Sequence, residues 1–158
     1  MHSSHFLFQV SVATQLRPLD AELLKIPATA KEANLALTIT PELDEEDGSN
    51  AARELQYLGW GKVLSAKIFC EIDGKYQVAL YDTLNGGHSI NEELVSVGLA
   101  KLPKRSEIAS LSAMMENPSG VEKFAMDLGV AQDEAKRRRS GMWRYGDVGE
   151  YDDDDDNF

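Results

Sequence analysis

Hydrophobic and polar residues alternate with a period of two in three stretches of the first half of this chain, and this period predicts strands. The first stretch is NLALTIT, residues 34–40. The second and third, residues 62–72 and 76–82, flank an Asp-Gly pair, which is typical of a tight β-hairpin turn. Residues 6–12 (FLFQVSV) also alternate, but no neighbouring stretch offers a partner strand.

Short helices are predicted between and after these strands. Ser49 is a suitable N-cap for a helix of about three turns that ends at Gly59. Residues 90–99 (INEELVSVGL) form a second helix, opened by Ser89 or by Asn91. LAKLP, residues 99–103, then resembles a short strand, and residues 106–115 resemble a third helix. The face of the second helix expected to be buried consists of Ile90, Leu94 and Val97.

A longer helix is predicted from about residue 119 to residue 139. Its last turn holds four consecutive cations, which oppose the negative end of the helix dipole. Gly141 is the expected C′ residue, and Trp143 just beyond it is expected to be a buried anchor. The buried stripe of this helix is expected to consist of Val121, Phe124, Leu128, Ala131 and Ala135.

Charge is distributed unevenly along the chain, whose formal net charge is −11. Residues 147–158 hold seven acidic residues and no basic one, which predicts a disordered, solubilising tail. Residues 42–47 (ELDEED) form a second acidic run, whereas residues 101–144 contain nine bases against six acids. The cations of this half form either a solvated face or a surface for phosphate contact. They are Lys101, Lys104, Arg105, Lys136, Arg137, Arg138, Arg139 and Arg144.

Other candidate chemistry is sparse. The chain is the size of one domain and has no apolar run of about 18 residues, so we expect no membrane partner. The lone Cys70 fits core packing and a reducing compartment, and we expect cytoplasmic localisation with the nucleus as a second setting. None of the three histidines has a partner at metal-ligand spacing, so no metal site is predicted. Trp60, Tyr76 and Tyr81 fit the core or base stacking, and we favour the core.

The order of these elements and two sequence blocks, SINEELVSVGLAKL (89–102) and EAKRRRSGMWRYGD (134–147), resemble the staphylococcal nuclease-like domain. More narrowly, they resemble the C-terminal end of the Tudor staphylococcal nucleases, which are RNA-associated co-activators, over about residues 16–150. The resemblance implies an α+β fold, an OB-type five-stranded β-barrel packed with three α-helices, over residues 34–146. Residues 16–33 resemble the linker that leaves a Tudor barrel, and residues 1–15 stay unassigned.

In that family the last nuclease-like unit is interrupted by the Tudor barrel, so its first strands precede the barrel. The resemblance therefore implies that this chain is a fragment or a truncated relative whose barrel is incomplete.

The resemblance also allows the catalytic positions to be compared. The family's strand reads R-x-x-x-x-D-T-P-E; here Thr40 and Glu42 are retained, whereas Asn34 and Ile39 stand at the arginine and aspartate positions. The second phosphate-binding arginine falls near Lys75. A hydrocarbon offers no oxygen to Ca²⁺, and an amide cannot pair bidentately with phosphate. We therefore expect no catalytic residues, with Thr40 and Glu42 as remnants, and no cofactor; calcium would be needed only by an active nuclease.

Three functions follow as hypotheses. The first is a catalytically degenerate module that binds RNA in a salt-sensitive way and acts as a protein scaffold, in RNA silencing, RNA processing and transcriptional co-activation as the resemblance implies. The second is an active calcium-dependent ribonuclease. The third is a module that contacts only proteins, which would suit the acidic tail.

Overall fold

The computed structural model describes residues 21–22, 25, 30–84, 87–114 and 118–146, and its centre is a three-stranded sheet. The strands are β1 (Ala33–Leu35), β2 (Leu64–Ile72) and β3 (Lys75–Asp82), in the order β1-β3-β2. β1 runs parallel to β3, and β2 is antiparallel to it. Asp73 and Gly74 in the β2–β3 turn both have positive φ, as a two-residue hairpin of the I′ type requires. The predicted hairpin is confirmed.

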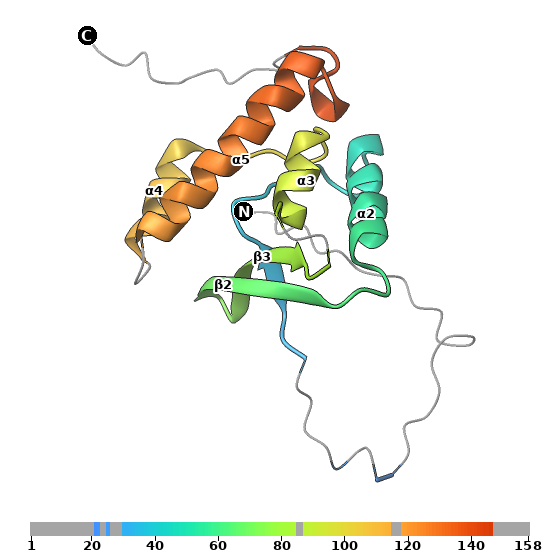
Figure 1. Ribbon diagram of the computed structural model, residues 1–158, viewed down its shortest axis with the longest axis vertical. Coiled ribbons are helices and arrows are strands. Elements are labelled where there is room, and N and C mark those ends of the chain that lie inside the picture. Colours follow the sequence, from blue (N-terminus) through green and yellow to red (C-terminus); the bar gives the residue numbers. More distant parts are fainter. Residues whose placement is uncertain (1–20, 23–24, 26–29, 85–86, 115–117, 147–158) are drawn as a thin grey trace.

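Four α-helices lie on one side of this sheet (Figure 1). They are α2 (Glu46–Gly59), α3 (Ile90–Ser96), α4 (Arg105–Ala113) and α5 (Pro118–Arg138), and a 3₁₀ turn, η2 (Gly141–Trp143), follows α5. The fold is therefore α+β, as expected. The described residues form three strands and four helices, so the expected five-stranded barrel and three helices are not confirmed. No helix in the described part of the chain is both long enough and apolar enough to cross a membrane.

The predicted strand over residues 34–40 is interrupted after three residues. Leu37 has a φ of 54°, a left-handed conformation that turns the chain away from the sheet. Beyond the turn, the backbones of Ile39 and Lys101 exchange two hydrogen bonds of 2.8 Å each. This isolated bridge is what the structure has in place of the strand predicted over residues 99–103. Alternation alone did not signal the turn because Leu37 is still buried.

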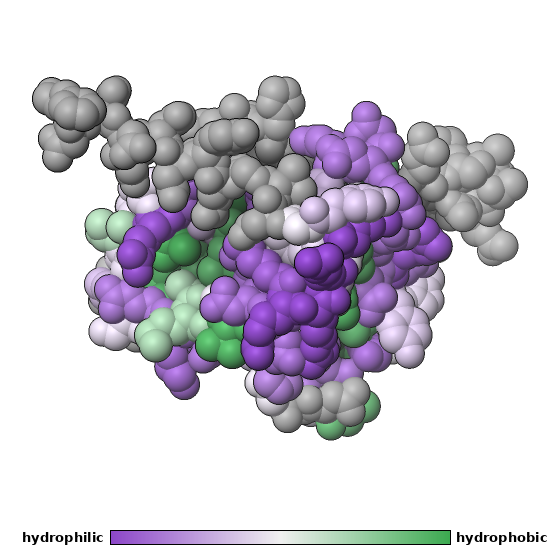
Figure 2. Space-filling model, turned by 90° about the horizontal axis from the view of Figure 1, so that it is seen from above, coloured by the Kyte–Doolittle hydropathy of each residue, from purple (hydrophilic) through white to green (hydrophobic). Residues whose placement is uncertain are grey.

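The hydrophobic core lies between β3, α3 and α5. All five members of the stripe predicted on α5 are buried, as are Ile90 and Leu94 of α3. Val97 is an exception, because α3 ends at Ser96 and its side chain remains 41% exposed. Phe69 of β2 reaches the same core and lies with its ring centroid 5.2 Å from that of Phe124 on α5. On the face that Figure 2 presents, hydrophobic residues gather in a patch on the left and are otherwise largely covered by hydrophilic ones.

The helix ends differ from prediction in two places. α2 begins at Glu46, three residues before its predicted cap, and the Ser49 hydroxyl donates a hydrogen bond to the carbonyl oxygen of Glu46. Acidic residues in this first turn favour the earlier start because they complement the helix dipole. At the end of α5, the residue that directly follows the helix is Arg139 and not Gly141, and it has a left-handed φ of 54°. Gly141 also has a positive φ, but it begins η2. Of the two caps predicted for α3, Ser89 and Asn91, the structure has Ser89, whose hydroxyl accepts from the backbone N–H of Glu92.

Asn91 connects three parts of the fold. Its side chain is fully buried at the start of α3. The amide Nδ2 donates to the carbonyl oxygens of Ala36 and Val78 and to the hydroxyl of Thr38, at 3.0–3.2 Å. The amide oxygen accepts from the backbone N–H of Leu80 at 3.2 Å. This one side chain therefore holds α3 to β3 and to the turn that follows β1.

Two glycines join the end of α3 to η2. Gly98 and Gly141 both have positive φ, and the carbonyl oxygen of Gly98 accepts a 2.9 Å hydrogen bond from the N–H of Met142. A Cβ placed on Gly98 would lie 2.1 Å from the carbonyl oxygen of Ser140, and one placed on Gly141 would lie 2.3 Å from that of Gly98. The backbones meet at a distance that a side chain on either residue would prevent, so the two sequence blocks 89–102 and 134–147 touch here.

Candidate functional site

The positions that correspond to the family's nuclease site lie between β1 and the start of α2. Asn34 is half-buried in β1, whereas Ile39 is 40% exposed and is held through its backbone by Lys101. Thr40 is half-buried, and Glu42 is exposed beside the first turn of α2. Among the residues that the structure describes, no three His, Cys, Asp or Glu side chains converge to hold a metal ion. At the two positions where the resemblance implies an arginine and an aspartate, the chain presents the amide of Asn34 and the hydrocarbon side chain of Ile39.

Gly48 explains how the segment after Thr40 is fixed. It is buried in the first turn of α2, and a Cβ built on it would lie 1.8 Å from the carbonyl oxygen of Glu42. The chain therefore crosses directly over the helix at this glycine. This contact serves the fold, because it holds the backbone of Glu42 and leaves its carboxylate exposed to solvent.

Seven of the eight candidate RNA-contacting cations come from the end of α5 and from a segment that is attached to α5. Lys136 and the three arginines after it occupy the last turn and the end of α5. The other segment, which leads into α4, is attached to α5 by a 2.9 Å hydrogen bond from the N–H of Leu102 to the side-chain oxygen of Gln132. Gln132 is one helical turn before Lys136. The segment from α3 to α4 crosses α5 at the middle of the helix, and the cationic last turn of α5 extends beyond the crossing (Figure 1).

These cations differ in how they are already engaged. Arg137 and Arg138 form ion pairs with Glu134 one turn earlier. The ammonium group of Lys136 lies 4.6 Å above the ring centroid of Trp143, a cation–π contact. The remaining four are exposed and form no ion pair with any acidic side chain in the described ranges. They are Lys101, Lys104, Arg105 and Arg139.

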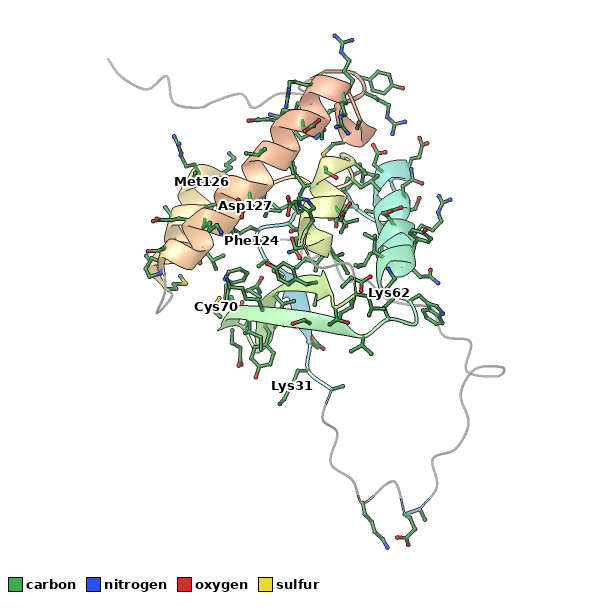
Figure 3. The ribbon with its side chains drawn as sticks, in the orientation of Figure 1. Lys31, Lys62, Cys70, Phe124, Met126 and Asp127 are labelled. Atoms are coloured by element: carbon green, nitrogen blue, oxygen red, sulfur yellow. The ribbon has the colours of Figure 1, made fainter. Side chains whose placement is uncertain are left out.

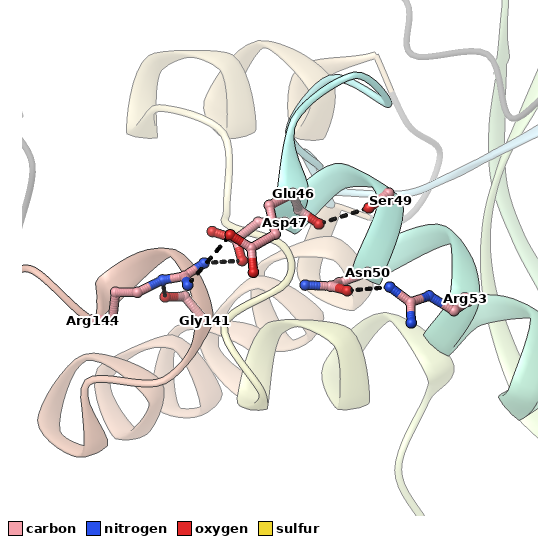
Figure 4. Close-up of polar contacts among 7 residues, drawn as sticks. All are labelled: Glu46, Asp47, Ser49, Asn50, Arg53, Gly141 and Arg144. Carbon is pink, nitrogen blue, oxygen red and sulfur yellow. Dashed lines mark hydrogen bonds and ion pairs between the residues drawn. The ribbon is translucent and has the colours of Figure 1, made fainter.

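Arg144 has a structural role in this fold (Figure 4). Its guanidinium donates to the carboxylate of Asp47 at 2.5 Å and lies 3.8 Å from that of Glu46, and its Nε donates to the carbonyl oxygen of Gly141. The hydrogen bond and charge of Asp47 raise the pKa of Arg144 above its ordinary value, so the group stays charged. The ion pair joins η2 to the first turn of α2, and it leaves this side chain less available to phosphate than the exposed cations.

The Arg144–Asp47 pair can be tested by a double-mutant cycle. Arg144→Gln and Asp47→Asn should each lower the melting temperature, and the double variant should lose less than the sum of the two single losses. Because the pair is partly exposed, the coupling should shrink in about 1 M salt, where the Debye length falls to about 3 Å. Strictly additive losses at low salt would contradict the pairing.

The exposure of the aromatic side chains agrees with prediction at Trp143 and disagrees at Trp60. Trp143 is buried, 8% exposed, as predicted. Trp60, for which we favoured the core, is 73% exposed, so that prediction was wrong. Tyr57 of α2, which the sequence analysis did not single out, is 77% exposed. Trp60 lies just beyond the last residue of α2, between two glycines, and this position is the sequence signal that could have indicated exposure. Tyr76 and Tyr81 are half-buried.

The pKa values of His88, Tyr81 and Cys70 are raised by their surroundings. The Nδ1 atom of His88 lies 2.6 Å from a carboxylate oxygen of Glu92, and this contact raises the pKa of His88. Burial, followed by the charges of Glu92 and Asp127, raises the pKa of Tyr81. Burial also raises the pKa of Cys70, which disfavours the thiolate and agrees with a packing role rather than a nucleophilic one.

Comparison with known proteins confirms the resemblance to Tudor staphylococcal nucleases. The chain is 28% identical over 152 residues to Ribonuclease TUDOR 1 and 28% identical over 156 residues to Ribonuclease TUDOR 2, both of Arabidopsis thaliana. These matches cover 89% and 90% of this chain but 14% and 15% of the relatives. The chain therefore spans about a seventh of the length of the relatives it matches. No model of a known protein family matches it.

The fold has a counterpart among solved structures. The extended Tudor domain of Drosophila melanogaster Tudor-SN (p100) superposes with a TM-score of 0.62 at 20% identity. The match covers 83% of this chain and 55% of the other. This likeness supports an α+β fold of the staphylococcal nuclease-like kind.

Proposed function

We propose that this chain is a catalytically degenerate nuclease-like module that binds RNA through the exposed cations before and at the start of α4 and after α5. The observation that carries the proposal is the group of four exposed cations that form no ion pair with a described acid, two on the segment before α4, one at its start and one after α5. A cation that is already paired with a carboxylate contributes little free energy to phosphate binding. A cation without such a partner contributes more, because counterions are released when it binds phosphate. The two Arabidopsis relatives are named ribonucleases, which agrees with an RNA ligand.

Removing free cations from this group should weaken RNA binding. The double variant Lys104→Gln/Arg105→Gln should bind a single-stranded oligouridylate about tenfold less tightly at low salt. The slope of log affinity against log salt should fall by about 1.4, since each phosphate contact with a single strand contributes about 0.7. Fluorescence anisotropy over a salt series measures both quantities.

A matched control separates the site from net charge. Lys31 and Lys67 are also exposed cations, but they belong to the sheet side of the molecule, where Figure 3 shows Lys31 far from the end of α5. Lys31→Gln/Lys67→Gln removes the same charge and should leave affinity within about twofold. Equal losses in both double variants would show that only the overall charge matters, and would overturn the proposed site.

The alternative, an active calcium-dependent ribonuclease, is favoured by the names of the relatives. The residues at the nuclease positions oppose it, since Ile39 supplies no ligand for the ion and Asn34 supplies no charge to the phosphate. We expect the pure chain to leave single-stranded RNA intact in millimolar Ca²⁺, with the same gel pattern in EDTA. Cleavage that EDTA stops and that Glu42→Gln abolishes would establish the alternative.

The cellular setting follows from the same resemblance. We place the module in RNA silencing, RNA processing and transcriptional co-activation, as a part that holds both RNA and protein partners. Such work is compatible with the cytoplasm and with the nucleus. A crosslinking experiment on the full-length protein, with RNA recovered from each compartment, would test both the RNA contact and its location.

A further inference from the structure

Helix α2 carries two stripes of residues with the same spacing. One stripe faces the core and contains Gly48, Ala51, Leu55 and Leu58, which are buried or packed against it. The other stripe lies on the opposite side of the helix, and its residues are spaced by four, three and four. Steps of three and four residues are those of a helix face that packs against a second helix. The outer stripe consists of Glu46, Asn50, Arg53 and Tyr57, and Trp60 follows it directly after the end of α2.

The outer stripe borders a groove in the surface. The groove lies between α2 and the segment that follows α3, and it has a volume of about 860 Å³. Val97 and Leu99 form its apolar side from that segment. Tyr57 and Trp60 border it from α2 and remain 77% and 73% exposed. Trp, Tyr and Arg are the residues most enriched at the centres of protein interfaces, and all three types line this groove.

Charge around the groove indicates the character of its occupant. Within it, Glu54 balances Arg53, whose guanidinium already donates to the amide oxygen of Asn50 at 2.7 Å (Figure 4). At the Asn50 end, the chain enters α2 through the acidic run 42–47. Apart from Asp47, which is half-buried beside Arg144, the acids of this run are exposed. This end therefore repels phosphate and attracts a basic segment.

We infer that the outer face of α2 binds an amphipathic helix of a partner protein, with an apolar face on the Tyr57–Trp60 end and basic residues toward the acidic run. The helical spacing of the stripe favours a helix as the occupant. The exposed rings of Tyr57 and Trp60 provide the apolar contact, and the acidic run 42–47 favours a partner with basic residues. This surface is separate from the cations beside α5 and does not depend on RNA binding there.

Two synthetic helical peptides with identical leucine positions test the inference, one with Lys and Arg on its polar face and the other with Glu. Because Trp143 is buried, a change in tryptophan emission on binding reports on Trp60. The basic peptide should shift the emission to the blue and bind at least tenfold more tightly than the acidic one by calorimetry in about 0.15 M salt. Tyr57→Ser should reduce that affinity at least tenfold while keeping the reporter.

Met126→Ser is the matched control, since Met126 is 72% exposed on α5, away from α2 (Figure 3). It should leave peptide affinity within twofold. Melting curves will show whether each variant is folded. Equal binding of both peptides, an equal loss in the Met126 variant, or no binding would overturn the inference. So would an oligouridylate that competes for the Trp60 signal, or self-association that Trp60→Ser abolishes, because the occupant would then be RNA or a second copy.

Discussion

Alanine at Gly141 should destabilise the folded protein by at least about 3 kcal/mol, and alanine at Gly98 should do the same. Each new Cβ would meet a backbone carbonyl oxygen at 2.1–2.3 Å, and neither backbone can move without separating α3 from η2. The positive φ of both residues adds a cost of about 1–2 kcal/mol for a side chain. Since domains are stable by about 5–15 kcal/mol, either variant should lose much of its folded population on modest warming. Urea unfolding followed by circular dichroism measures this loss.

Substitutions at two other glycines distinguish the steric cost of the new Cβ from the conformational cost of a positive φ. Gly61 has a φ of 70°, but a Cβ added there would have nothing within 4 Å, so Gly61→Ala should cost only the conformational part, about 1–2 kcal/mol. Gly129 lies within α5 in open space, and Gly129→Ala should stabilise the protein by up to about 1 kcal/mol. If Gly141→Ala cost no more than Gly61→Ala, the close backbone contact would not exist in solution.

Replacing Asn91 with alanine should destabilise the protein by about 2–4 kcal/mol. The N–H of Leu80, which is half-buried, loses its side-chain acceptor, and the carbonyl oxygens of Ala36 and Val78 each lose a donor. The empty space left at a fully buried position adds to the cost. Asn50→Ala is the control, because Asn50 is half-buried near the surface and its loss should change stability by about 0.5 kcal/mol or less.

The variant Asn91→Asp distinguishes hydrogen bonding from simple packing. A carboxylate at this place would face two carbonyl oxygens in a buried site, so its pKa in the folded state should be raised. The folded protein then binds a proton more tightly than the unfolded chain, and the stability of this variant should increase as the pH falls. The Asn91→Ala variant should show no such pH dependence relative to the wild type. Parallel pH profiles for both variants would exclude the role given to the Asn91 amide.

Periodicity predicted the local elements well where one face of an element is buried along its whole length. The stripe on α5 and the β2–β3 hairpin both follow from spacing and from turn residues, because burial of one face leaves the same repeat in the sequence. The break at Leu37 did not show in the pattern, since the residue stays buried while its backbone turns. Trp60 was misassigned because an aromatic ring is usually buried, and this expectation outweighed the two flanking glycines, which could have indicated exposure.

The sequence could predict which residues belong to the candidate site, but not which contacts those residues make in the fold. The sequence identified the cations and the replacements at Asn34 and Ile39, because residue identity decides what a side chain can bind. It did not show that Arg144 is already held by Asp47, which lies 97 residues away, or that Lys136 covers Trp143. Nor did it distinguish the two faces of α2, because Tyr57 and Leu58 are adjacent in sequence and only packing decides which one is covered.

By itself, the sequence determined the helix periods of this protein, its hairpin and its cationic segments. Only the tertiary structure decided which groups are free to act. Contacts between distant segments, such as Gly98 with Gly141 and Asn91 with Val78, fix the backbone and thereby determine which cations are paired and which aromatic rings are exposed. Such contacts depend on distances in space, and no local repeat in a chain records them.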